Sequence, residues 1–163
     1  MRVLFLLTIS SFFFFKNNIS NNFSDPVTIR VTCQQKEHKL GKDLWVDLLI
    51  TNNQNRILQV ADELYFGFAK DSSSEVVFEV KKVEGNKYIT QRPTGDYNYF
   101  YDIKHKNYLN LQKNDSHTFP FLLSTFYTLS KGKYCVRAKY IVPEINKINK
   151  KFIYSIWEQF EVK

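Results

Sequence analysis

Apolar and polar residues alternate along most of the chain after residue 25, and this period of two is typical of β-strands with one buried face. The alternation predicts eight or nine strands. We expect them at Val27 to Cys33, Leu44 to Thr51, Ile57 to Val60, Leu64 to Phe68, Glu75 to Val83, Tyr108 to Leu111, Ser116 to Leu122, Tyr134 to Val142 and Ile153 to Val162. Pro120 marks its strand as an edge or bulged strand, because proline has no N–H to donate. We predict one short helical turn between Ser124 and Leu129.

The segment from Leu129 to Tyr134 carries the most specific fold signal. Gly132 is followed two residues later by Tyr134, at the start of an alternating strand. This is the pattern of a tyrosine corner, in which the tyrosine hydroxyl bonds back to the main chain just upstream and fixes a crossover between two sheets. The sequence therefore predicts an all-β, Ig-like Greek-key β-sandwich over residues 25–163.

The first residues predict a signal peptide. Arg2 precedes an uncharged run from Val3 to Phe15, and an Asn/Ser-rich stretch follows Lys16. A basic start before a short apolar run is typical of secretory signals, and the run is shorter than the roughly 20 residues of a membrane-spanning helix. We assign residues 1–24 to a signal peptide and short polar linker, and we expect an extracytoplasmic protein (periplasmic, cell-surface or secreted) with no permanent membrane span.

The charge of the chain changes this picture little. The net charge of the whole chain is +7, from 23 basic and 16 acidic residues. Residues 1–24 contain two of the basic residues and none of the acidic ones, so residues 25–163 have 21 basic and 16 acidic residues and a net charge of +5. The basic residues are scattered, without the stripe or motif of a nucleic-acid binder. We expect no nucleic-acid partner.

The two cysteines, Cys33 and Cys135, leave their pairing open. An exported protein permits a disulfide. However, Cys33 continues the inward set of Val27, Ile29 and Val31, whereas Cys135 is out of phase with its inward-facing neighbours. Cysteines on opposite faces do not bridge without a bulge or register shift.

Motifs of catalysis and metal binding are missing from the sequence. His38, His105 and His117 lie at no metal-ligand spacing, and there is no G-x-S-x-G, phosphate-binding loop or EF-hand pattern. We expect no cofactor, no metal and no enzymatic activity.

Aromatic residues supply the candidate binding site. Tyr97, Tyr99 and Tyr101 fall in a Tyr-rich stretch, and tyrosine offers rigid contact area with a hydroxyl at its tip. The alternative is a strand whose alternate rings pack on the core. Trp45 is out of phase with Leu44 and Val46, so it faces away from them, either as a ligand platform or as cover for a second sheet face.

The order of these signals resembles Ig-like β-sandwich modules of exported bacterial proteins, including proteinase-inhibitor-like and protease-prodomain-like sandwiches. The matching positions are Val46, Leu48, Ile50 and Asn52, then Leu111, Ser116 and Phe119, then Leu129, Gly132, Tyr134, Val136, Ala138 and Tyr140, and finally Ser155, Trp157, Phe160 and Val162. The resemblance carries no site residue. We expect a non-catalytic module that binds a protein or glycan through loops at one end of the sandwich. The alternative is a protease inhibitor or regulatory domain that acts by loop insertion.

Overall fold

The computed structural model describes residues 26–64, 75–94, 107–142 and 151–163. The strands are β1 (Val27–Cys33), β2 (Glu37–His38), β3 (Trp45–Asn52), β4 (Leu58–Ala61), β5 (Val76–Glu84), β6 (Lys87–Thr90), β7 (Tyr108–Leu111), β8 (Ser116–Leu122), β9 (Gly132–Val142), β10 (Lys151–Tyr154) and β11 (Glu158–Val162). A single 3₁₀ turn, η2 (Leu123–Thr125), is the helical element of these ranges. The predicted all-β class is confirmed.

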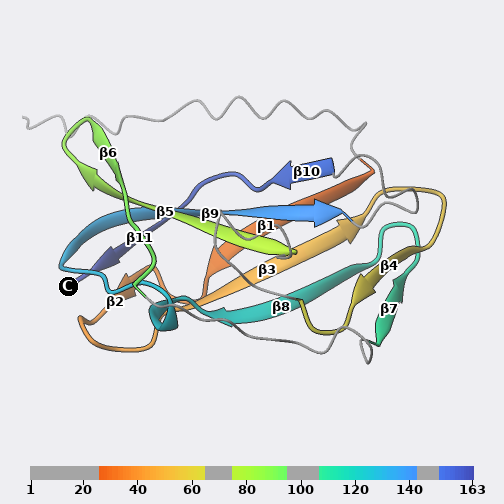
Figure 1. The fold of residues 1–163 in the computed structure, drawn as a ribbon, viewed down its shortest axis with the longest axis horizontal. Helices are drawn as coiled ribbons and strands as arrows, with labels where there is room; N and C mark the ends of the chain where they lie inside the picture. The colour runs from red at the N-terminus through yellow and green to blue at the C-terminus, as the bar shows by residue number, and fades with distance from the viewer. Residues whose placement is uncertain (1–25, 65–74, 95–106, 143–150) are drawn as a thin grey trace, which may run out of the picture.

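Two sheets pack against each other as an Ig-like β-sandwich (Figure 1). One has the order β1-β3-β8, and the other has the order β2-β11-β9-β5-β6 with β10 also paired to β9. Strands β4 and β7 form a small separate pair at one end. The β2–β11 pairing is parallel, and the remaining pairings are antiparallel. Strand β8, which contains Pro120, lies at the edge of its sheet within the described residues, as the proline predicts.

The core lies between the sheets and follows the alternation in the sequence. In β1 every second residue is buried, and in β3 the side chains of Val46, Leu48 and Ile50 are fully buried. From the other sheet β9 contributes Val136 and Ala138, which are also fully buried. Burial at about 25 cal/mol per Å2 of apolar surface makes this the main stabilising contribution.

The crossover from β8 to β9 is fixed by the predicted tyrosine corner. Tyr134 is 1% exposed, and its hydroxyl donates a hydrogen bond to the main-chain oxygen of Ser130 at 2.8 Å. Its ring stacks on Phe160 of β11, with the centroids 5.5 Å apart. The corner is therefore confirmed, and it joins the crossover to the last strand of the same sheet.

Three elements differ from the sequence prediction. The final strand is two strands, β10 and β11, separated by a bulge. Strand β6 was not predicted, because all four of its residues are exposed and leave no alternating pattern. Strand β2 has only two residues, too few to show a period. The predicted strand from Leu64 to Phe68 lies outside the described residues apart from Leu64.

Candidate binding face

The sequence-predicted binding residues do not come together in the described structure. Tyr97, Tyr99 and Tyr101 lie outside the described residues. Trp45 opens β3 opposite Leu122 and is 38% exposed, so it faces away from the core as predicted. It belongs to the three-stranded sheet.

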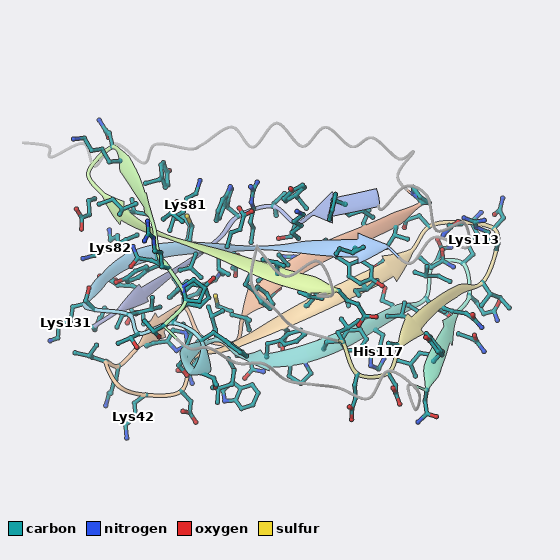
Figure 2. All side chains as sticks on the ribbon, in the orientation of Figure 1. Lys42, Lys81, Lys82, Lys113, His117 and Lys131 are labelled. Carbon is teal, nitrogen blue, oxygen red and sulfur yellow. The ribbon has the colours of Figure 1, made fainter. Side chains whose placement is uncertain are left out.

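The outer face of the six-stranded sheet holds a different group of side chains, which we call the cation–aromatic row. It consists of three cations and three rings from β5, β9, β10 and the bulge: Lys81, Trp157, Arg137, Tyr154, Lys139 and Phe152. Cations and rings alternate along it. Figure 2 labels Lys81, the β5 residue at one end of the row.

Trp157 connects the two strands that carry the first two cations. The Nζ atom of Lys81 lies 4.7 Å from the centroid of the Trp157 ring, and Cζ of Arg137 lies 4.6 Å from it. Both distances are within the range of about 6 Å for a cation–π interaction, which is worth about 0.5–1 kcal/mol at an exposed site. The indole therefore holds a lysine of β5 and an arginine of β9 on one surface.

The second half of the row pairs β9 with β10. Cζ of Arg137 lies 4.7 Å from the Tyr154 ring centroid, and Nζ of Lys139 lies 3.8 Å from that of Phe152 and 5.9 Å from that of Tyr154. Tyr154 faces Lys139 directly in the strand register. Tyr154 and Phe152 nevertheless stay 47% and 43% exposed. Two large rings are thus ordered by neighbouring cations and still open to solvent.

A one-residue bulge between β10 and β11 brings Trp157 onto this face. Tyr154 lies opposite Lys139, and Glu158 lies opposite Val136. Residues 155–157 therefore lie opposite only residues 137–138 of β9, which leaves one extra residue on the β10–β11 side. Ser155 fixes the bulge: its main-chain N–H donates to the oxygen of Ala138 at 2.9 Å, and its Oγ accepts from the N–H of Ala138 at 2.9 Å. Bulges re-aim side chains in this way.

The row is unevenly neutralised. Glu79 of β5 lies opposite Arg137, and its Oε2 accepts from Nε at 2.8 Å and Nη2 at 2.7 Å. Within the part of the chain that the structure describes, Lys81 and Lys139 have no carboxylate partner. Three cations against one carboxylate leave a local charge of +2.

The cysteines confirm the two-faced geometry of β9. Cys33 packs in the core between the sheets, whereas Cys135 lies on the outer face of β9, opposite Lys81 and Gln159. Cys135 is nevertheless only 3% exposed. Both are free thiols. Burial, followed by the negative charge of Glu158, raises the pKa of Cys33 to about 12, and burial also raises the pKa of Cys135.

A hollow of about 360 Å3 lies beside β2, the turn after it and η2. Three of its polar side chains are already bonded within the protein. His38 Nε2 lies 2.6 Å from the oxygen of Gln35, Ser124 Oγ accepts from the N–H of Leu44 at 3.1 Å, and the hydroxyl of Tyr127 donates to the oxygen of Phe78 at 2.7 Å. The cation–aromatic row, with unpaired cations and open rings, is the stronger candidate site.

The sequence contained part of the signal for this face. Alternation places Arg137 and Lys139 on the opposite side of β9 from Val136 and Ala138, so two outward cations could have been found. The pairing register and the bulge are set by tertiary structure, and they decide which rings meet these cations.

In the described ranges, no group of three or more His, Cys, Asp or Glu residues could hold a metal ion.

No protein-family model matches the chain, and no curated protein matches it. Among solved structures it is similar to the sporulation control protein Spo0M of Bacillus subtilis, at 12% identity and a TM-score of 0.41 over 85% of this chain and 50% of that one. It is similar to the CARDB domain of a Pyrococcus furiosus protein, solved with di-metal ions, at 11% identity and a TM-score of 0.37 over 83% and 91%. It is also similar to a β-glucosidase of Listeria innocua, at 12% identity and a TM-score of 0.34 over 83% of this chain and 16% of that one. The chain therefore spans half of Spo0M, and the fold assignment rests on the strands and their pairing.

Proposed function

We propose that the chain is an exported, non-catalytic binding module whose contact surface is the cation–aromatic row. The observation that carries the proposal is the exposure of Tyr154 and Phe152, at 47% and 43%, beside cations that lie over their rings. Aromatic residues and arginine are enriched at protein interfaces and concentrate binding energy there. A sheet presents them on a rigid surface, so little conformational freedom is lost on binding.

Export is supported by the apolar run from Val3 to Phe15 behind Arg2. Of the residues that the structure describes, none form a helix with the length and hydrophobicity needed to cross a bilayer. Mass spectrometry of the protein from its native host should show a first residue between about 17 and 25. Recovery of intact Met1 from the cytoplasm would contradict export.

The binding surface can be tested by capturing partners from the extracytoplasmic fraction of the host. We expect Phe152→Ser with Tyr154→Ser to lose capture while the melting temperature changes little, because both rings lie on the outer face of the sheet and not in the core. The matched control is Tyr88→Ser with Ile89→Ser in β6, which are 50% and 44% exposed on the same sheet. This control should capture as well as the parent chain.

A third variant separates the sheet face from the sequence-predicted loop. Changing Tyr97, Tyr99 and Tyr101 to Ser should leave capture intact if the row is the contact surface. If this variant alone loses capture while still folded, the partner binds the loop and the row is the wrong surface. A turnover screen and a peptidase panel test the remaining classes, since catalysis or loop-dependent inhibition would overturn the non-catalytic binding proposal.

A further inference from the structure

We infer that the partner of the cation–aromatic row is an extended acidic polypeptide segment, with Asp or Glu at alternate positions, lying along β9. This inference rests on the proposed function and adds the chemistry of the partner. Three properties of the row support it: its charge, the spacing of its cations and their ordering by the rings.

The charge of the row selects an anion. Lys81 and Lys139 lack a carboxylate partner within the described ranges, and Glu79 is already bonded to Arg137. The guanidinium has five N–H donors, and Glu79 takes two of them, from Nε and Nη2. Each cation of the row can therefore still donate to an incoming carboxylate. A cationic or second-copy partner would bring like charges together, which is unfavourable.

The spacing of the cations matches a strand. Lys81 lies level with Cys135 in the β5–β9 register, and Arg137 and Lys139 follow at steps of two residues along β9. Since a strand rises about 3.3 Å per residue, the three cations stand roughly 7 Å apart along the strand direction. Alternate side chains of an extended peptide repeat at the same distance on one face. Alternate acidic residues of such a segment would therefore meet successive cations.

The aromatic rings preorganise the cationic side chains for contact with a carboxylate. Lysine and arginine side chains normally lose rotamer freedom when they bind, which weakens binding. Here the Nζ of Lys139 already lies 3.8 Å from the Phe152 centroid, and Arg137 lies between the Tyr154 and Trp157 rings. The side chains of Arg137 and Lys139 have therefore already lost part of their rotamer freedom before the partner binds.

The test uses a short synthetic peptide of alternating Glu and Thr, titrated into the purified full chain with Trp45→Phe, so that fluorescence reports Trp157. We expect saturable binding that weakens as salt rises, since the screening length falls from about 10 Å at 0.1 M to 3 Å at 1 M. Lys81→Gln with Lys139→Gln should weaken binding roughly tenfold. The control Lys42→Gln with Lys113→Gln removes two exposed lysines away from the row (Figure 2) and should leave binding unchanged.

Two comparison probes make the inference falsifiable. A Gln-Thr peptide should not bind, and a sulfated polysaccharide should bind more weakly than the Glu-Thr peptide. If the polysaccharide binds in a Lys81- and Lys139-dependent manner and the peptide does not, the partner is a glycan and the inference is wrong. If neither probe binds but Phe152→Ser with Tyr154→Ser still abolishes capture from the host fraction, the proposed function stands and the acidic partner does not. If the double serine variant keeps full capture, the proposed surface itself fails.

Discussion

The hydroxyl of Tyr134 donates to the main-chain oxygen of Ser130 across four residues, and it also lies 3.1 Å from the hydroxyl of that serine. Both contacts come from the segment that enters β9, so one side chain in the core holds the crossover that precedes it. The corner therefore positions β9, the strand that supplies two of the three cations of the row.

We predict that Tyr134→Phe lowers the free energy of unfolding by about 1–1.5 kcal/mol, because a largely buried hydrogen bond is lost while the packing on Phe160 is kept. Chemical denaturation should show a lower midpoint with an unchanged slope. Tyr88→Phe is the control, since Tyr88 is 50% exposed. An unchanged midpoint for Tyr134→Phe would contradict the stabilising role of the corner.

Gly132→Ala should destabilise the fold by about 1 kcal/mol or more. Gly132 has a φ of +145°, and a Cβ there would lie 2.9 Å from Cε of Lys82. Gly85→Asn is the matched control, because its φ of +58° is one that asparagine adopts readily and a Cβ there meets nothing within 4 Å. A thermal melt in which both variants shift equally would show that the strain at Gly132 has no special cost.

Ser155→Ala should cost about 1–3 kcal/mol, because the N–H of Ala138 loses the bond to Ser155 Oγ inside the fold. Trp157 follows the bulge, so its fluorescence should change in the same variant. Ser116→Ala removes the exposed contact with Thr51 and should change stability by no more than about 0.5 kcal/mol. A stable Ser155→Ala with unaltered Trp157 fluorescence would mean that the main chain alone holds the bulge.

Truncation of Val136 to Ala should cost about 1–3 kcal/mol, because Val136 is fully buried between the sheets. Ile57→Ala removes one more side-chain carbon than Val136→Ala, but from a side chain that is 52% exposed, so it should cost less. Calorimetric melts of the two variants check the order. If Ile57→Ala lost more stability than Val136→Ala, the assignment of Val136 to the core would be wrong.

Stability should fall as pH rises above about 9. The pKa of Cys33 is raised from 9.0 to about 12, so the unfolded chain releases this proton at a lower pH than the folded one. The stabilisation is complete below pH 9 and is lost progressively as pH rises through 12. Burial also raises the pKa values of Tyr127 and Tyr140 above 10, which acts in the same direction. Cys33→Ala should show a shallower decline between pH 9 and 11 in urea titrations, and an equal slope would exclude this thiol as a source.

The sequence was sufficient for the strands that alternate, because burial of every second residue leaves a period that can be read directly. Val27 to Cys33 and Ser116 to Leu122 have the predicted bounds, and the tyrosine corner follows from Gly132 and Tyr134. Strand β6 could not be predicted in this way, since among the described residues it pairs with β5 and buries none of its own side chains.

The candidate site was harder to predict because it depends on register. Lys81 and Arg137 are far apart in sequence, and only the β5–β9 pairing and the bulge place both over Trp157. The prediction of Tyr97, Tyr99 and Tyr101 as binding residues rests on their density in the sequence, a signal that takes no account of what lies across the sheet. They remain a prediction.

The bulge at Ser155 has a consequence for sequence change in this protein. Residues of odd number face the core in β10, where Ile153 is buried, whereas residues of even number face it in β11, where Phe160 and Val162 are buried. Loss of the extra residue would remove the bulge but keep the register, with Glu158 still opposite Val136, so Phe160 and Val162 would stay in the core. A single-codon deletion at Ile156, which is 65% exposed, should therefore leave the last strand in its native register.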